Sequence, residues 1–258
     1  MFKKPMGLLG IFLIIVGIGY FVGAGVAYSK TQGGYDSLQA FSQAQNVQLS
    51  YNDQGQLVDR GETEGAVAIM ALLKDDWKFP VVNSDLDPND PLVNTATEFM
   101  YQMATISHHT LTGTQHVVLT ESDLTGEDGT VATEYTCNGE TVAVPTPFPA
   151  DGVTCDFKVD GRYWTGFDRS DPVQAQARDM AWSGTAHALV AELGVGAATH
   201  SALQLALGIA ALLAGLGVVC TVMGIAFIWD TRKKSKSAVP DTIPESMLAD
   251  TPGKAQTV

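Results

Sequence analysis

The sequence predicts a mainly α membrane protein in which two transmembrane helices flank a helical extracytoplasmic domain with a small disulfide-linked antiparallel β insertion. Two long segments, 8–28 and 201–229, contain no Asp, Glu, Lys, Arg or His. Each is long enough to cross a hydrocarbon layer of about 30 Å, which takes roughly 20 helical residues. The segment between them is strongly acidic and holds two of the three cysteines.

The composition excludes two classes of protein. Only 17% of the 258 residues are charged and the net charge is -13, whereas soluble proteins carry about 25% charged residues. Because the uncharged residues concentrate in the two long segments, a soluble enzyme is not expected. The acidic balance repels phosphate and there is no basic stripe outside the ends of these segments, so we expect no nucleic-acid partner.

Charge also predicts the topology. Residues 29–200 hold 8 Lys and Arg against 24 Asp and Glu, a charge of -16, whereas the two ends together carry +3. The basic residues that flank the apolar segments are Lys3, Lys4, Arg232, Lys233, Lys234 and Lys236. Since such residues stay in the cytoplasm, we expect a plasma-membrane protein with both termini cytoplasmic and 29–200 extracytoplasmic.

The first apolar segment has a second interpretation. Lys3 and Lys4 precede a hydrophobic run, and 25–27 (GVA) offers small residues for signal-peptide cleavage after Ala27. The run continues to Tyr28 without a polar stretch before the cleavage site, and this favours an uncleaved anchor over residues 1–28.

Residues 29–200 are numerous enough for one domain with its own core. After a break at Gly33 and Gly34, a polar amphipathic helix is expected over 35–49. Segment 62–73 is apolar and predicts a buried helix, and 94–108 has the helical spacing of a second one. The Asp, Asn and Pro residues of 83–91 predict a loop.

Between 117 and 163 the pattern changes to short β-branched runs separated by glycine-containing turns, which predicts the antiparallel β insertion. Cys137 and Cys155 both lie in it, on the oxidising side of the membrane in the predicted topology. A disulfide between them is predicted, and closing a loop of this size stabilises the folded state by about 3 kcal/mol. Cys220, within the second apolar segment, is expected to be a packing residue.

Asp171 followed by Pro172 is a strong helix start. A helix is expected over 173–193, loosened at Gly194 and Gly196 and continuing into the second transmembrane helix at 201–229. The last segment, 230–258, cannot bury enough apolar surface to fold alone. It is therefore predicted to be a disordered cytoplasmic tail.

No residue pattern predicts an enzyme or a cofactor. His108 and His109 point about 100° apart on a helix, His116 adds no HExxH spacing, and Glu98 is about three turns from His108. The acidic run 85–90 (DLDPND) offers oxygen ligands for weak Ca²⁺ binding but lacks the glycine and terminal glutamate of a calcium loop. We therefore expect no catalytic residue, metal site or cofactor.

The apolar segments themselves carry a packing signal. Small residues recur every four positions on each, and this spacing lets helix backbones approach closely in lipid. These residues are Gly19, Gly23 and Ala27 in the first segment and Ala202, Ala206, Ala210 and Ala214 in the second. We expect the two helices to pack on each other or on helices of a partner.

Segments 94–113 (NTATEFMYQMATISHHTLTG) and 161–180 (GRYWTGFDRSDPVQAQARDM), followed by a Gly- and Ala-rich span, resemble a family of uncharacterised actinobacterial membrane proteins. The matching residues are Ala104, Ile106, His109, Leu111, Gly161, Tyr163, Asp168, Arg169, Asp171 and Pro172. Residues 114–160 are inserted relative to the family. Members are often labelled aromatic ring-opening dioxygenases, but an Fe(II) site needs two histidines and a carboxylate, and the matched segments supply one histidine. The resemblance implies an outer helical domain on two transmembrane helices.

Two functions follow as hypotheses. The first is a non-enzymatic two-span protein of the cell envelope whose outer domain is an interaction or accessory module. Its partners would be the lipid bilayer and other membrane proteins or a second copy of itself. The second is a membrane-anchored sensor or transport accessory whose outer domain binds a small ligand or cation.

Overall fold

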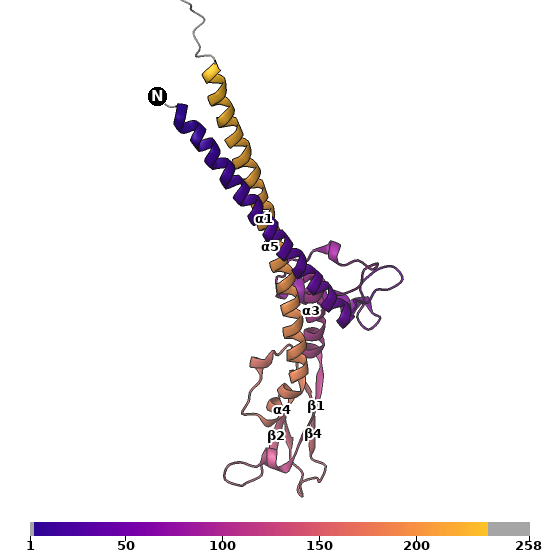
Figure 1. Cartoon of the computed structure of the whole chain (residues 1–258). Helices are drawn as coiled ribbons and strands as arrows, with labels where there is room; N and C mark the ends of the chain where they lie inside the picture. Colours follow the sequence, from indigo (N-terminus) through magenta and orange to yellow (C-terminus); the bar gives the residue numbers. More distant parts are fainter. Residues whose placement is uncertain (1–2, 237–258) are drawn as a thin grey trace, which may run out of the picture. The chain divides into compact units, whose positions relative to one another are not determined.

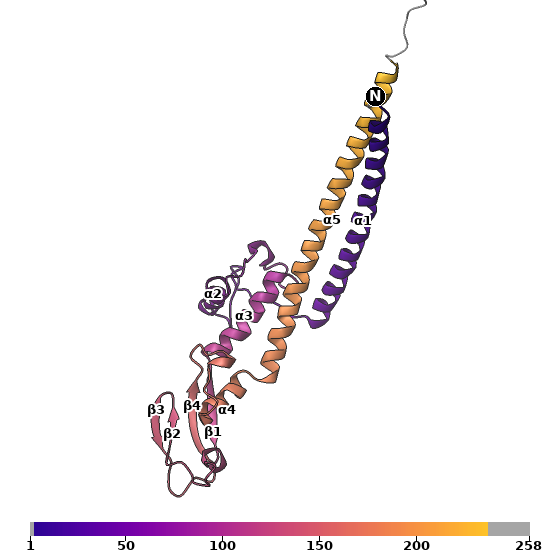
Figure 2. The same ribbon diagram turned by 90° about the vertical axis from the view of Figure 1, so that its left-hand side faces the viewer.

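The structure is a computed structural model that describes residues 3–236. The chain divides into two compact units. The helix-pair unit is formed by residues up to Gln32 and from Leu205 onward, and the central unit by Gly33–Gln204. Figures 1 and 2 show the elements of each unit from two sides.

Two long helices, α1 (Lys3–Gln45) and α5 (Gly184–Lys236), supply the helix-pair unit. Within that unit they lie side by side in both views (Figures 1 and 2). They are antiparallel: Gly10 is in contact with Gly224, and Gly17, further along α1, is in contact with Gly217, which comes earlier on α5. The prediction of two long apolar helices that pack together is thus confirmed.

The ends of these helices differ from those that we predicted from the sequence. No break occurs at Gly33 and Gly34, through which α1 continues to Gln45. A methyl group added at Gly34 would collide with Leu203, so this glycine permits a close helix contact. Helix α5 likewise continues through Gly194 and Gly196. It also extends past Trp229 to Lys236, into the predicted tail, and the rest of that tail (237–258) lies outside the described residues.

Helices α2 and α3 form one part of the central unit. α2 (Thr63–Ala71) passes into a π-helical turn, η1 (Leu72–Asp76), which matches the buried helix expected at 62–73. A short 3₁₀ turn, η2 (Asn83–Asp85), interrupts the predicted loop. α3 (Ala96–Thr112) begins at a capping box: the Glu98 amide donates to the Thr95 hydroxyl, and the Thr95 amide donates to the Glu98 carboxylate.

The β insertion consists of two small antiparallel sheets. β1 (Thr114–Leu119) pairs with β4 (Val153–Lys158), and β2 (Glu134–Cys137) pairs with β3 (Glu140–Ala143). A 3₁₀ turn, η3 (Glu121–Leu124), follows β1. The predicted disulfide is present and joins Cys137 of β2 to Cys155 of β4. It therefore links the two sheets covalently where few backbone hydrogen bonds hold either one.

After a 3₁₀ turn, η4 (Trp164–Gly166), the helix predicted at Asp171 appears as α4 (Pro172–Ala181). The Asp171 carboxylate accepts hydrogen bonds from the amides of Val173 and Gln174, and Pro172 occupies the first turn. α4 then ends at Trp182, so the chain breaks before α5 and not at Gly194. The Ser183 hydroxyl accepts a hydrogen bond from the Ala186 amide and begins the new helix.

The apolar core of the central unit draws on all of these elements. Its largest fully buried apolar side chains come from the α2 region, from β1, from the residue after β4 and from α4, and α4 packs on β1 and β4. These side chains are Ile69, Leu73, Val117, Leu119, Val159 and Val173. The core therefore combines residues more than 100 positions apart and holds the helices around the cavity described next.

Candidate functional site

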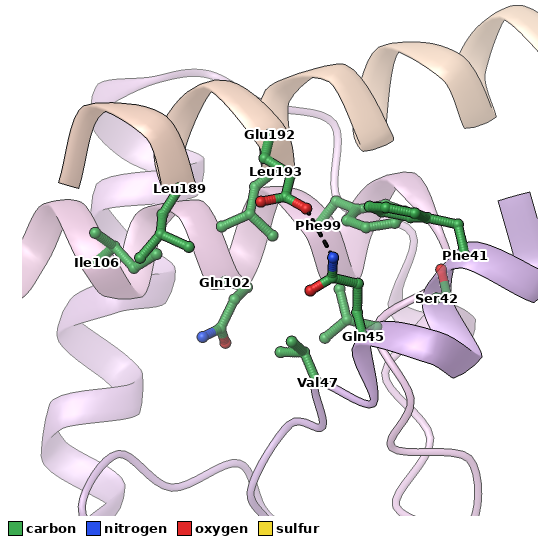
Figure 3. A pocket seen from close by; sticks show the side chains of 11 residues that line it. Phe41, Ser42, Gln45, Val47, Phe99, Gln102, Ile106, Leu189, Glu192 and Leu193 are labelled. Carbon is green, nitrogen blue, oxygen red and sulfur yellow. Dashed lines mark hydrogen bonds between the residues drawn. The ribbon is translucent and has the colours of Figure 1, made fainter. Parts of the chain in front are cut away.

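An apolar cavity of about 220 Å³ lies in the central unit among α1, α3 and α5 (Figure 3). Its walls are mostly apolar. The apolar lining residues are Phe41, Val47, Val93, Phe99, Ile106, Leu189 and Leu193, and the polar ones are Ser42, Gln45, Gln102 and Glu192. Because the lining comes from three helices and the segment after α1, the cavity exists only in the folded chain.

Two local features shape this cavity. The capping box of Thr95 and Glu98 fixes the first turn of α3, and Phe99, whose ring forms part of the wall, follows Glu98 directly. On the facing helix, a methyl group added at Gly196 would lie 2.7 Å from the Phe99 ring. Gly196 is therefore required for the ring to lie against α5, and a glycine expected to loosen the helix serves instead to pack it.

The polar groups of the cavity fall into two kinds. Gln45 Nε2 donates a hydrogen bond of 3.0 Å to Glu192 Oε1, which connects the end of α1 to α5 (Figure 3). Both residues are exposed, so they border the opening. Ser42, in contrast, is only 2% exposed, and its hydroxyl has no hydrogen-bond partner in the structure. A buried hydroxyl without a partner costs free energy, so Ser42 is suited to accept or donate a bond to a molecule in the cavity.

A smaller polar pocket of about 150 Å³ shares Gln102 with this cavity. Asp59 and Tyr101 line it, and Asp59 Oδ1 lies 2.9 Å from His109 Nε2. The Tyr101 hydroxyl is buried without a partner. Burial, with the nearby Asp59 and Tyr51, raises the pKa of Tyr101 to about 12, so its hydroxyl stays protonated.

An aromatic groove of about 480 Å³ is another concave feature of the central unit. Trp77, Tyr163 and Trp182 line it, and the Trp77 indole donates a 3.0 Å hydrogen bond to the Tyr163 hydroxyl. The Tyr163 ring stacks on Trp182, and the Trp182 indole donates to the Arg162 carbonyl. These bonds occupy the N–H donors of both indoles, and the Tyr163 hydroxyl takes part in the first of them as the acceptor.

The predicted helix-packing residues lie in several environments. Ala210 is buried, Gly23, Ala27, Ala206 and Ala214 are half-buried, and Gly19 and Ala202 are exposed. A methyl group added at Gly19 would meet nothing within 4 Å. Gly19 therefore takes no part in the contact between α1 and α5.

The closest backbone contacts between the two helices are at four other glycines, which we call the glycine seam: Gly10, Gly17, Gly217 and Gly224. A methyl group at Gly10 would lie 2.7 Å from the Gly224 carbonyl oxygen, and one at Gly17 would lie 2.9 Å from that of Gly217. The seam repeats every seven residues, because seven residues end about 20° short of two full turns. Four residues pass one turn by about 40°, so a four-residue pattern rotates away from the contact. A search for small residues at seven-residue spacing would have found the seam.

The predicted topology residues lie at the ends of the two long helices. Lys3 and Lys4 begin α1, and Arg232 to Lys236 end α5. Arg232 is exposed. Their cytoplasmic location stays a prediction.

The histidines and acidic residues considered as metal ligands have local roles. His116 lies across the β1–β4 pair from Asp156, 2.7 Å from its carboxylate. Asp87 accepts hydrogen bonds from the Asn89 backbone and side chain, which lower the pKa of Asp87. Within residues 3–236 no three His, Cys, Asp or Glu residues are grouped as a metal site would require.

Comparison with protein-family models, curated proteins and solved structures finds no match for the chain. The resemblance to the actinobacterial two-helix membrane proteins stays a prediction. Of its matching residues, Ile106 lines the apolar cavity, Tyr163 lines the aromatic groove, and His109 lies against Asp59.

Proposed function

We propose that the chain is a non-enzymatic two-span protein of the cell envelope, with both termini in the cytoplasm and residues 29–200 as an extracytoplasmic interaction or accessory module. The observation that carries this proposal is the distribution of side chains in the helix-pair unit, which is the reverse of that in a water-soluble protein. Glycines lie between the helices, whereas large apolar side chains face outward; Leu8 is 73% exposed and Leu205 67%. An apolar exterior of this kind is stable in lipid and not in water.

The same distribution argues against two other interpretations. A core helix of a soluble protein is mostly buried, but only 17% and 11% of the most apolar stretches of α1 and α5 are. Cleavage of a signal peptide after Ala27 would remove Gly10 and Gly17 and leave Gly217 and Gly224 without the backbone they contact. Retention of the first helix as an anchor is therefore favoured.

Cysteine labelling in intact cells tests the topology. In a Cys220→Ala background, a membrane-impermeant maleimide should modify a cysteine placed at Glu127, in the acidic segment. It should leave a cysteine at Ser237 unmodified until the membrane is permeabilised. Modification of the Ser237 position in intact cells would contradict the cytoplasmic C-terminus. Affinity purification of the full chain from detergent extracts would then identify partners of the module.

The apolar cavity supports a second candidate function, a membrane-anchored sensor or transport accessory that binds a small ligand. Both α1 and α5 line the cavity, and each continues without a break into an apolar segment. A ligand that stabilised this part of the two helices would raise the melting temperature of the full chain in nanodiscs. No rise with any small solute would leave the interaction module as the better description.

A further inference from the structure

The apolar cavity carries one negative charge that the protein does not neutralise. In the central unit, residues 33–204, close pairs of a basic and an acidic side chain join His109 to Asp59, His116 to Asp156 and Arg178 to Asp179. None of them includes Glu192, whose carboxylate accepts a hydrogen bond only from the neutral amide of Gln45. A carboxylate at the edge of an apolar cavity is stabilised by a positive group, so the cavity favours a cationic ligand over an anionic one.

The second polar feature is the Ser42 hydroxyl. It lies on α1 three residues before Gln45, and side chains at this spacing share one face of a helix. Ser42 is nearly inaccessible to solvent and its oxygen has no partner. An ammonium group has three N–H donors, which is enough to serve the Glu192 carboxylate and the Ser42 oxygen together.

The charge of the surrounding chain also favours a cationic ligand over an anionic one. Residues 29–200 carry -16, and a field of that sign raises the local concentration of cations and lowers that of anions. The walls formed by Phe41, Phe99 and Leu193 exclude a hydrated inorganic cation, which would lose its water without gaining enough oxygen ligands. An organic cation with an apolar body satisfies both the walls and the charge.

We propose that the cavity among α1, α3 and α5 binds a small protonated amine with an apolar body. The body lies against Phe41, Phe99 and Leu193, and the ammonium group donates hydrogen bonds to Glu192 and Ser42. This inference rests on the second candidate function, which it deepens by naming the class of ligand. Because the contact residues belong to three helices, the bound amine ties α1 to α5 through α3.

Calorimetric titration of the full chain in nanodiscs of neutral lipid tests the proposal with three probes of similar shape: phenethylamine, phenethyl alcohol and hydrocinnamate. At neutral pH they are a cation, a neutral molecule and an anion. We expect the amine to bind about fivefold more tightly than the alcohol, as for one partly exposed charge pair. The carboxylate should bind more weakly than both, and added salt should reduce only the advantage of the amine.

Four variants separate the contributions. Glu192→Gln keeps an oxygen for the Gln45 amide but removes the charge, so it should abolish the advantage of the amine and leave alcohol binding unchanged. Glu127→Gln makes the same change of net charge in an exposed loop and is the matched control. Ser42→Ala should weaken both amine and alcohol, and Leu189→Trp should block the cavity to every probe.

The outcomes distinguish this inference from the function on which it rests. Equal binding of amine and alcohol, or an amine advantage that survives Glu192→Gln, would overturn the cationic ligand while the ligand-binding function stands. Failure of all three probes to bind would overturn both. Neither result bears on the topology, which cysteine labelling decides separately.

Discussion

The helix-pair unit and the central unit distribute their side chains in opposite ways. Between α1 and α5 the buried positions are small residues such as Gly10, Ala210 and Gly224, and the bulky apolar residues face outward. In the central unit the bulky residues are inside, with Ile69 and Leu73 fully buried. The two units of one chain are thus packed in opposite ways, and the proposed location of the helix pair in lipid and of the central unit in water accounts for the difference.

The two units also differ in what holds them together. In the proposed membrane location, the seam depends on close backbone contact and van der Waals packing, because burial of apolar side chains between helices is not favoured over their contact with lipid. The central unit adds a disulfide, a capping box and a core whose exclusion of water is favourable. A change in one unit should therefore leave the other intact, and this independence can be tested.

The largest effect is expected from removal of the disulfide. The pair Cys137→Ser and Cys155→Ser should lower the free energy of unfolding of the central unit by about 3 kcal/mol, because an 18-residue separation is no longer closed in the unfolded chain. Three of the four tryptophans lie in this unit, so fluorescence during urea unfolding in detergent measures it. Cys220→Ser is the control, and an equal loss in that variant would contradict the assignment.

The next effect concerns the glycine seam. At Gly224 an added side chain would begin 2.6 Å from the Gly10 carbonyl oxygen, so Gly224→Leu should destabilise the helix pair by about 1–3 kcal/mol. Gly215, on the same helix, has nothing within 4 Å of an added methyl group, and Gly215→Leu should be neutral.

Disulfide cross-linking between cysteines at Gly7 and Thr231 measures this contact. An added methyl group at Gly7 would lie 3.7 Å from the Thr231 hydroxyl, and Cys220→Ala removes competition. Equal cross-linking in the Gly224 and Gly215 variants would show that the seam does not hold the pair. A change of particle size on Gly19→Leu would show that the exposed glycine contacts a partner helix.

A smaller effect is expected from Glu98, which is 2% exposed. Burial raises the pKa of Glu98 above its ordinary value of 4.5, although hydrogen bonds from Asn94 and Thr95 oppose this. The folded state then favours the protonated form. The stabilisation by this group is complete below pH 4.5 and is lost as the pH rises through the folded pKa.

Urea unfolding of the wild type and Glu98→Gln between pH 4 and 7 tests the sign. The stability of the wild type relative to the variant should fall as the pH rises. A relative gain over the same range would mean that the hydrogen bonds outweigh burial and that the pKa is lowered.

The smallest effect is expected from the pair of His116 and Asp156 on the surface of β1 and β4. Their side chains are 64% and 75% exposed, and solvent screens such pairs to about 0.5 kcal/mol or less. His116→Asn should therefore leave the urea midpoint nearly unchanged at pH 6. A shift as large as that of the disulfide variant would show that the insertion depends on this pair.

Several local features were predictable because their signals lie within a few residues. Asp171 and Pro172 begin a helix with the capping geometry that the pair implies. Cys137 and Cys155 form the expected disulfide, and the uncharged segments lie on helices long enough to span a membrane. Helix breaks were predicted less well, because glycine lowers helix propensity in isolation but permits close packing in a folded chain. Gly34 against Leu203 and Gly196 against Phe99 illustrate this difference.

By itself, the sequence determined which segments are long and apolar enough to span a membrane, where the charge lies and which cysteines pair, since each depends on composition or on short spacing. Only the tertiary structure decided which small residues meet and which polar groups share a cavity. Gln45 and Glu192 are 147 positions apart, and no local pattern relates them to Ser42. The physical reason is that the rotation of α1 and α5 about their axes, and hence the face each presents, is set by packing against distant residues.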